Sequence, residues 1–381
     1  MKDSEPLNYQ YIDTAVKLDR VAKSLVQRKT VAVDLEADSM HHYKEKICLI
    51  QMASRKSCVI IDPLQIQDLS PLKDLFANPQ IQKIFHGADY DVRSLYRDFN
   101  IRIQNLFDTE LACRFLGLPE TGLDAVLLKH FNVRLNKRFQ KKDWSIRPLP
   151  REMIDYAAGD VFHLIPLASK LKSELKSKGR LSWIREECEH LSHVRPTVNN
   201  EEPLFLRFKG AGRLNPRSLT ILESLLQMRD GIAQKKDKPW FKILRNQTLL
   251  NIAIAQSSNP DSLLIHRLLS AKEMSKYGGL ISRAVDHALA IPEDCLLKYP
   301  YQPTPRVKSS ARGRIRKLRQ WRDRKAKILQ LNAAIICSKT LLSIIAHENP
   351  KTITELRKIE EIKDWQFEAF GKELLDALKR G

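Results

Sequence analysis

The sequence contains no run of about 20 uninterrupted apolar residues, the length that a helix needs to cross a bilayer, and its start, MKDSEPLNYQ, has no apolar signal-peptide core. Cysteine is scarce, and none of the six cysteines forms a C-x-x-C pair. Cys188, His190 and His193 stand close together on a charged, helix-like stretch, but no second pair of ligands accompanies them, so we expect no zinc site. We therefore expect a reduced, cytoplasmic protein without a membrane span.

Acidic residues are outnumbered, because 65 lysines and arginines face 45 aspartates and glutamates and give a net charge of +20. This excess favours a polyanionic partner, and attraction to phosphates depends on salt but little on base sequence. An acidic membrane surface is the alternative, although no amphipathic basic anchor is evident. The length of 381 residues and the 43% share of hydrophobic residues suffice for two or three domains with cores of their own.

Five side chains in three short segments carry most of the functional information: Asp34, Glu36, Asp91, Tyr156 and Asp160. Residues 30–35, TVAVDL, are rich in β-branched side chains, which predicts a strand. Residues i and i+2 of a strand share a face, so Asp34 and Glu36 project together. Two adjacent carboxylates repel each other unless a cation lies between them, and Mg²⁺ prefers oxygen ligands of this kind.

The other three polar side chains fall on expected helices. Residues 149–171 have apolar positions at helical spacing, so Tyr156 and Asp160, at i and i+4, share a face. Asp91 follows the strand-like IQKIF at the start of a helix, where the helix dipole favours an anion. Taken alone, each pattern is common on protein surfaces, and Asp91 could be a helix cap or a solvated acid. Taken together and in this order, they predict one site that holds two divalent ions beside a phosphodiester.

These segments resemble the three exonuclease motifs of the DEDD superfamily, in the branch whose last motif is Y-x-x-x-D (DEDDy). Further segments are similar to the ribonuclease D family, namely LIQMAS, DPL at 62–64, HGADYD, FDT at 107–109 and KDWSIRPL. The resemblance implies an α/β RNase H-like exonuclease domain, with a mixed five-stranded sheet flanked by helices. It also implies a 3′→5′ exonuclease that releases nucleotides one at a time.

The resemblance also assigns roles within the site. Asp34 would bridge two divalent ions, with Mg²⁺ expected and Mn²⁺ as the alternative. Glu36 and Asp160 would complete the site of the first ion, and Asp91 would serve the second. Tyr156 would orient the nucleophilic water, because a phenol with a pKa near 10 is a poor base at neutral pH.

Two positions near these motifs are less informative. In many relatives a bulky residue follows the motif glutamate, whereas Ala37 stands here. The group His41–His42–Tyr43 could supply stacking instead, and a solvated loop is the equal alternative. We expect His86 to be a structural hydrogen-bonding residue rather than a catalytic base.

The second half of the chain contains an internal repeat. QMRDGIAQ at 227–234 matches QWRDRKAK at 320–327, and TLLNIAIAQSSNP from Thr248 matches TLLSIIAHENP from Thr340, at an offset of about 90 to 93 residues. Two copies of this length predict tandem domains rather than a solenoid. Both resemble the helicase-and-RNase-D C-terminal (HRDC) domain, a helical bundle that binds nucleic acid in several relatives and can bind protein in others. Generic bundle packing is the alternative explanation of the repeat.

The predicted organisation is therefore one α/β domain followed by two all-α HRDC-like helical bundles. The expected parts are an exonuclease domain at 1–195, a linker at 196–211, a first HRDC domain at 212–292, a basic linker at 293–315 and a second HRDC-like domain at 316–381. We expect a monomer, because the bundles enclose their own apolar faces.

Two basic segments are candidates for RNA contact, with a solvated surface as the alternative for each. Between Arg306 and Lys327, eleven lysines and arginines accompany one acid, and the candidates there are Arg312, Arg314, Arg316 and Lys317. The segment 134–142, RLNKRFQKK, precedes the last motif and should flank the mouth of the site; its candidates are Arg134, Lys137, Arg138, Lys141 and Lys142. Phe139 could stack on a base, whereas we expect Trp144 to be buried.

These observations predict a metal-dependent 3′→5′ exoribonuclease that hydrolyses single-stranded RNA 3′ ends to nucleoside 5′-monophosphates. The resemblance points to maturation of transfer RNA precursors. A DNA 3′→5′ exonuclease is the alternative within the same chemistry, because nothing in the residues fixes contacts to a 2′-hydroxyl. An RNA-binding protein with a decayed nuclease site is the alternative from another class, and the retention of all four acids and Tyr156 argues against it.

Overall fold

The structure is a computed structural model that describes residues 8–196, 202–300 and 309–379. The described residues divide into two compact units. Residues 8–37, 47–196 and 309–379 belong to the first unit, and residues 38–46 and 202–300 belong to the second. Residues 197–201 and 301–308 of the two predicted linkers lie outside the described residues.

The first unit is built on a mixed six-stranded sheet with the order β1-β4-β3-β2-β5-β6. The strands are Gln10–Ile12 (β1), Thr30–Ala37 (β2), Ile47–Ala53 (β3), Cys58–Ile61 (β4), Gln82–Phe85 (β5) and Leu106–Asp108 (β6). β3 runs antiparallel to β2 and β4, and the other neighbours are parallel. The expected mixed sheet is confirmed, and the short β1 adds a strand to the predicted five by pairing with β4.

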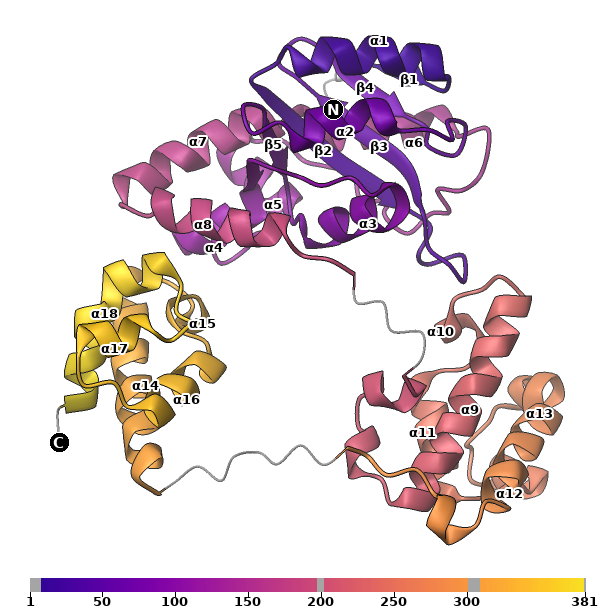
Figure 1. Cartoon of the computed structure of the whole chain (residues 1–381). Coiled ribbons are helices and arrows are strands. Elements are labelled where there is room, and N and C mark those ends of the chain that lie inside the picture. The colour runs from indigo at the N-terminus through magenta and orange to yellow at the C-terminus, as the bar shows by residue number, and fades with distance from the viewer. Residues whose placement is uncertain (1–7, 197–201, 301–308, 380–381) are drawn as a thin grey trace. The chain divides into compact units, whose positions relative to one another are not determined.

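Helices cover both faces of this sheet, with α2 in front of it and α6 behind it in Figure 1. They are Ala15–Val26 (α1), Ser70–Ala77 (α2), Asp89–Phe99 (α3), Thr109–Leu116 (α4), Leu123–Phe131 (α5), Arg151–Phe162 (α6), Leu164–Ser177 (α7) and Leu181–Ser192 (α8). All seven residues of β3 are buried as a result. The single helix predicted at 149–171 is divided at His163, because Pro166 lacks an N–H and its ring clashes with the carbonyl four residues earlier.

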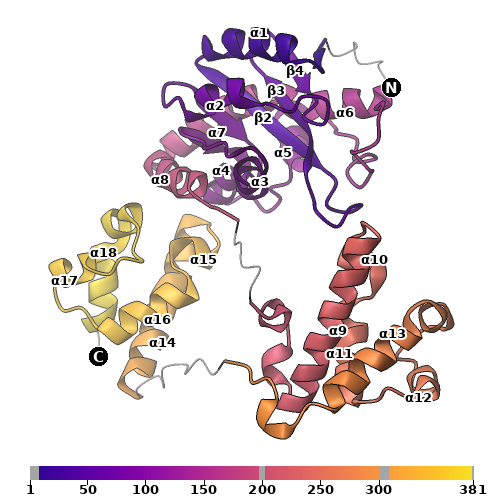
Figure 2. The ribbon, with the colours of Figure 1, turned by 45° about the vertical axis from the view of Figure 1, so that its right-hand side comes forward.

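The second unit is a helical bundle in which α9 packs against α11 and α13 (Figure 2). Its helices are Pro216–Lys235 (α9), Trp240–Ile243 (α10), Asn246–Ala255 (α11), Pro260–Ile265 (α12) and Ala271–Leu289 (α13), with short 3₁₀ helices at Leu204–Arg207, Ala211–Arg213 and Glu293–Cys295. The predicted linker 196–211 therefore extends too far. Phe205 is buried, and its backbone N–H and that of Leu204 donate to the Glu223 carboxylate of α9.

The second repeat forms a smaller bundle within the first unit. Its helices are Ser309–Leu329 (α14), Ala333–Ile336 (α15), Lys339–Glu348 (α16), Ile353–Arg357 (α17) and Asp364–Lys379 (α18). Helix α14 begins at Ser309, within the predicted linker 293–315. Packing explains the longer helix, because Ala311 is fully buried and Nε of Arg314 donates to the Ala346 carbonyl at 2.7 Å.

This second bundle is joined to the α/β domain through α8 and α18. The Glu186 carboxylate accepts hydrogen bonds from the backbone N–H groups of Asp364 and Trp365, both at 2.8 Å. A carboxylate in that position satisfies orphan donors at a helix N-terminus and complements the helix dipole. The Trp183 ring stacks on Trp365 with 4.7 Å between centroids. One hydrophobic core consequently runs from the sheet into the second bundle.

Trp365, which is 2% exposed, should therefore stabilise both partners of this contact. We expect Trp365→Ala to lower the free energy of unfolding by about 3–5 kcal/mol, the usual cost of deleting a buried aromatic side chain. In hydrogen exchange, amides of α8 as well as α18 should lose protection. Ile328→Ala, at a position of the same bundle that is 73% exposed, is the control and should change little. Unchanged protection of α8 in the Trp365 variant would contradict the shared core.

Candidate active site

The carboxyl ends of two parallel strands bring the acidic segments together. β2 carries Asp34 and Glu36 on one face. β5 runs parallel beside β2, with Thr30 opposite Gln82, so the loop after β5 leaves the same edge of the sheet. Helix α3 begins just after that loop and holds Asp91 in its first turn, 6% exposed. The predicted strand 30–35 and the helix start before Asp91 are thereby confirmed.

The FDT segment fixes the loop that precedes Asp91. The Asp108 carboxylate accepts from the backbone N–H groups of Gly87 at 2.9 Å and Ala88 at 2.8 Å, and it also caps α4. The Thr109 hydroxyl lies 2.9 Å from Nδ1 of His86. Burial lowers the pKa of His86, so the imidazole is neutral at neutral pH. The contact with Thr109 agrees with the structural role expected at His86, but His86 also lines the pocket beside the acids, so that role stays a prediction.

A second pair of motifs fixes the approach to α6. Arg147, from KDWSIRPL, donates from Nε and Nη2 to the fully buried carboxylate of Asp62, at 2.6 and 2.7 Å. Its Nη2 also donates to the Cys48 carbonyl on β3, and the Tyr11 hydroxyl donates to Asp62 at 2.6 Å. Bidentate pairs of this kind are strong and directional. The segment entering α6 is therefore anchored to β1, β3 and the end of β4.

Tyr156 stands on α6 between two aromatic rings. Its ring centroid lies 5.8 Å from that of Phe139 and 6.0 Å from that of Trp144. Trp144 is 1% exposed, so it packs against Tyr156, as expected from the sequence. Burial raises the pKa of Tyr156 above its ordinary value, and the neighbouring Asp160, Glu36 and Asp34 raise it further. The phenol is therefore protonated at neutral pH and can act as a hydrogen-bond donor.

The acids form a concentrated cluster of like charges. Asp34, Glu36 and Asp160 each offer a carboxylate oxygen, and these oxygens lie within 4.8 Å of one another. Burial raises the pKa of Asp34 to about 7 and, together with Asp34, that of Asp160 to about 8. Burial and the neighbouring acids also raise the pKa of Glu36 well above its usual range.

Asp91 stands slightly apart from this cluster, outside the group of oxygens within 4.8 Å. It still senses the other acids, because burial, Asp34 and Asp108 together raise its pKa well above the usual range. None of the four acids forms an ion pair with a lysine or arginine in the described part of the chain.

This donor set fits divalent cations. Hard ions such as Mg²⁺ take carboxylate oxygens, and a close cluster of acids without a basic partner is stabilised in its ionised form by added positive charge. Gln51 on β3 lies directly opposite Asp34 in the strand register and is fully buried. Neither atom of its amide has a protein partner in the described residues. Buried polar groups are rarely unpaired, so this amide is consistent with a site that binds a hydrated ion.

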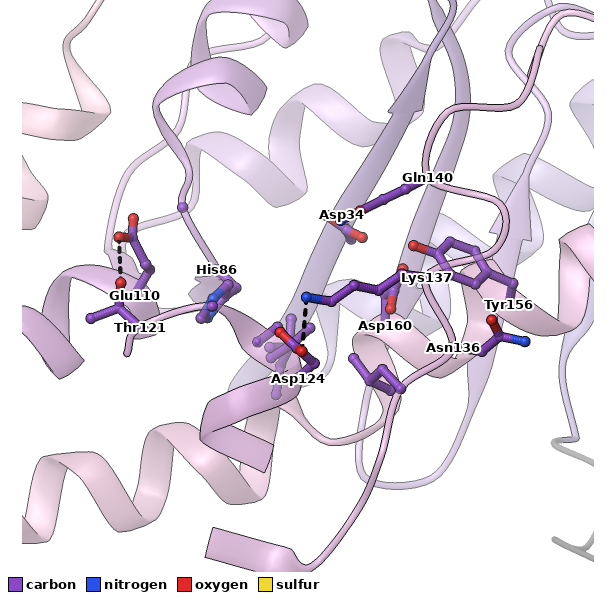
Figure 3. Close-up of a pocket in the computed structure, with 15 residues that line it drawn as sticks. Asp34, His86, Glu110, Thr121, Asp124, Asn136, Lys137, Gln140, Tyr156 and Asp160 are labelled. Carbon is purple, nitrogen blue, oxygen red and sulfur yellow. Dashed lines mark hydrogen bonds and ion pairs between the residues drawn. The ribbon is translucent and has the colours of Figure 1, made fainter. Parts of the chain in front are cut away.

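A pocket of about 400 Å³ opens beside the acids (Figure 3). Asp34, Tyr156 and Asp160 line one side of it, and the Lys137 ammonium reaches across to Asp124 at 2.8 Å. Asp124 and Gln140 also line the pocket and were not expected there from the sequence. Gln140 lies within the basic segment RLNKRFQKK and could have been found there, whereas no local pattern marks Asp124.

The structure exposes all five basic candidates of the segment 134–142: Arg134, Lys137, Arg138, Lys141 and Lys142. Lys137 lines the pocket, and the Arg138 guanidinium lies 4.5 Å from the centroid of the Phe139 ring. On α14, Arg312 and Arg316 are exposed, whereas Arg314 and Lys317 are half-buried. Contact of these residues with RNA stays a prediction.

The structure also bears on the cysteines, on the Cys188 and histidine group and on membrane-spanning helices. All six cysteines are free and, apart from Cys295, buried. Across residues 8–196, 202–300 and 309–379, the acids of β2 and α6 are the one group with metal-ligand spacing, and Cys188 with its neighbouring histidines is not another. No helix in these ranges is both long and apolar enough to span a bilayer.

Comparison with known proteins identifies the family. Residues 9–176 match the family model of a 3′-5′ exonuclease, and residues 218–285 and 311–378 each match that of the HRDC domain. Ribonuclease D of Nitrobacter hamburgensis is 30% identical over 375 residues, which make up 97% of this chain and 95% of that protein. The chain belongs to the ribonuclease D family.

Other relatives agree with this membership in fold and in sequence. The crystal structure of Escherichia coli RNase D covers 98% of this chain and 99% of its own, with a TM-score of 0.73 and 25% identity. Human exosome complex component 10 is 33% identical over 67% of this chain, and the chain spans 30% of the length of that protein. The family models and this structural match confirm the predicted fold of the chain, an exonuclease domain followed by HRDC bundles.

The raised pKa values predict how stability of the metal-free protein depends on pH. An aspartate has a pKa of about 3.9 in an unfolded chain, whereas Asp34 and Asp160 have values of about 7 and 8 in the fold. The folded state therefore binds protons more tightly, and stability falls as the pH rises from about 4 to about 8. We expect Asp34→Asn to raise the free energy of unfolding by about 1–4 kcal/mol above pH 8 and by little near pH 4.

Urea denaturation in EDTA from about pH 4 to above pH 8 measures the difference in free energy of unfolding between the wild type and Asp34→Asn. Asp19→Asn, at an exposed acid of α1, is the matched control and should show no such pH-dependent gain. Added Mg²⁺ should stabilise the wild type more than the Asp34 variant. The difference between their free energies of unfolding should therefore become smaller. A wild type that is as stable as Asp34→Asn at every pH in EDTA would show that the acids do not strain the fold.

Proposed function

We propose that this protein is a metal-dependent 3′→5′ exoribonuclease that hydrolyses RNA from its 3′ end to nucleoside 5′-monophosphates. The observation that carries the proposal is the cluster of half-buried Asp34 and Glu36 with buried Asp160, whose carboxylate oxygens lie within 4.8 Å of one another beside an open pocket. The match of residues 9–176 to a 3′-5′ exonuclease and membership of the ribonuclease D family support it.

Each acid has a proposed part in holding divalent ions, with Mg²⁺ as the proposed species. Asp34, Glu36 and Asp160 would hold one ion, and Asp34 with Asp91 would hold a second. Asp91 lies outside the tight group, which favours a contact of Asp91 through water. When bound, paired ions stabilise the attacking and leaving oxygens of an in-line phosphoryl displacement.

Tyr156 and Lys137 would act on the reactants from opposite sides of the pocket. The protonated phenol of Tyr156 would donate a hydrogen bond that orients the attacking water, and its raised pKa prevents it from serving as the base. Lys137 would exchange its Asp124 partner for a phosphate of the substrate, because the ion pair is exposed enough to open at low cost.

The proposed substrates are RNAs with a single-stranded 3′ tail, such as transfer RNA precursors. Escherichia coli RNase D is described as an exoribonuclease involved in structured RNA processing, which supports this choice. A single strand has to enter the pocket to reach the acids, so digestion should stop near a stable stem. We also propose that the protein acts as a cytoplasmic monomer.

Digestion of 5′-labelled RNA tests the function directly. The wild type with Mg²⁺ should shorten the RNA one nucleotide at a time from the 3′ end and release 5′-monophosphates. Asp34→Asn and Asp160→Asn should each lower kcat by about 10²–10³-fold or more, a loss typical of removing one group that stabilises the transition state. Asp19→Asn supplies the same chemical change at an exposed site and should retain full activity.

The same assay separates the alternatives. Faster digestion of DNA of the same sequence would indicate a DNA exonuclease. Binding of RNA without any metal-dependent shortening would indicate a non-catalytic RNA-binding protein. Full activity of both Asp34→Asn and Asp160→Asn would contradict the proposed active site.

The basic segment 134–142 should act on substrate affinity rather than on chemistry. We expect replacement of Lys141 and Lys142 by glutamine to raise KM for RNA several-fold at low salt and to leave kcat near the wild-type value. The slope of log KM against log salt should fall by about 1.4, because each phosphate of a single strand that a lysine neutralises adds about 0.7 to it. Replacement of Lys176 and Lys178, two exposed lysines of the same unit, is the control. An unchanged KM at every ionic strength would reject the role of the segment.

A further inference from the structure

Two large aromatic side chains lie exposed beside each other on the second unit. Trp240 is 46% exposed and Phe241 is 53% exposed, and both belong to the short helix α10. Exposed lysines and an arginine surround them in sequence, and we call the whole set the aromatic–basic face: Lys235, Lys236, Lys238, Trp240, Phe241, Lys242 and Arg245. Contiguous exposed apolar side chains mark interaction sites more often than single ones do.

The Trp240 ring is fixed in place although much of it is exposed. Its Nε1–H donates to the Asp230 carboxylate at 2.8 Å, and the Tyr43 hydroxyl donates to the same carboxylate oxygen at 2.7 Å. The Tyr43 ring meets Trp240 edge-on, with 6.5 Å between centroids, and the buried Arg229 guanidinium lies 5.9 Å from the Trp240 centroid. A ring held by its neighbours loses little conformational entropy when a ligand stacks on it.

The charge on this face is strongly positive. Between residues 235 and 245 there are five basic side chains and a single acid, Asp237. Both oxygens of Asp237 are engaged, because Nδ1 of His42 lies 2.7 Å from one and the Tyr43 N–H donates to the other at 3.1 Å. The hydrogen bond with His42 and that from Tyr43 lower the pKa of Asp237. The acid therefore holds the loop 38–46, and the five basic side chains outnumber it on this face.

Rigid aromatic rings among lysines match the chemistry of a single-stranded polynucleotide. Unpaired bases stack on aromatic side chains, and the phosphates between them bind lysine and arginine without regard to sequence. A duplex keeps its bases stacked inside and would leave the rings unused. An acidic peptide without aromatic residues would pair with the lysines but has no ring to place on Trp240 or Phe241.

We propose that the aromatic–basic face binds a single-stranded segment of the RNA substrate, with bases stacked on Trp240 and Phe241 and phosphates against Lys238, Lys242 and Arg245. The proposal rests on the proposed function, because it takes RNA to be the substrate. It adds a binding surface on the first HRDC domain, separate in sequence from the exonuclease residues.

Tryptophan fluorescence of the full chain tests the proposal without turnover. The Asp34→Asn variant in EDTA is titrated with an unstructured RNA oligonucleotide. The other four tryptophans, at positions 144, 183, 321 and 365, are buried or half-buried, so stacking on Trp240 should dominate the change in emission. We expect the RNA to quench the fluorescence, and Trp240→Phe, which keeps a ring but removes the indole, should abolish the quenching.

Phe241→Ala tests the second ring by affinity. Loss of one stacked base should weaken RNA binding by about 5- to 150-fold, as follows from the measured range of stacking energies. Ile265→Ala is the matched control, because Ile265 is 74% exposed on α12 of the same unit. Replacement of Lys242 and Arg245 by glutamine should lower the slope of log Kd against log salt by about 1.4. Thermal unfolding checks that each variant is folded.

Three results would overturn the proposal. They are wild-type affinity of Phe241→Ala for RNA, quenching that survives in Trp240→Phe, and equal quenching by a poly-glutamate peptide or by anionic vesicles. The proposed function can fail separately. If RNA quenches Trp240 but the wild type with Mg²⁺ never shortens it, the proposed function is rejected and the binding surface is retained. If the wild type digests the RNA normally and Phe241→Ala binds it as tightly as the wild type does, the proposed binding surface is rejected and the proposed function is not.

Discussion

The mutual repulsion of closely spaced carboxylates is the constraint on which the rest of the exonuclease domain depends. Asp34, Glu36 and Asp160 are held within a few Å of one another by a strand and a helix that meet only in the fold. Burial raises the pKa values of Asp34 and Asp160 to about 7 and 8, so the cluster works against stability at neutral pH when no cation is bound. The surrounding structure has to keep these groups together.

Two buried polar arrangements supply that rigidity. Asp108 ties the loop before Asp91 to the start of α4, and the ion pair of Asp62 with Arg147 ties the entrance of α6 to the sheet. In both cases a motif outside the acidic cluster positions a segment that carries one of the four acids. The acids come from three separate segments, and each segment is anchored by hydrogen bonds to backbone or by a bidentate pair.

Local spacing explains what could be predicted from the sequence. The i, i+2 pair of β2 and the i, i+4 pair of α6 share a face whatever the rest of the chain does, so the pairing of Asp34 with Glu36 and of Tyr156 with Asp160 followed from spacing alone. Pairings between distant residues left no such signal. The ion pair of Lys137 with Asp124 and the capping of α18 by Glu186 join residues that no periodicity connects. The break in the helix predicted at 149–171 could have been predicted from Pro166. The start of α14 could not, because it depends on tertiary packing.

The loop 38–46 has a consequence for the architecture of the whole chain. It follows β2, the strand of Asp34 and Glu36, directly, yet its His42 and Tyr43 bind Asp237 and Asp230 of the helical bundle. The polypeptide therefore enters the second unit twice, and no single cut can separate the two units while every native hydrogen bond is kept. A fragment that ends after α8 would keep this loop but lose the acids that bind it. Gain or loss of that bundle by a simple fusion or deletion would consequently require a matching change in the loop that follows the strand of Asp34 and Glu36.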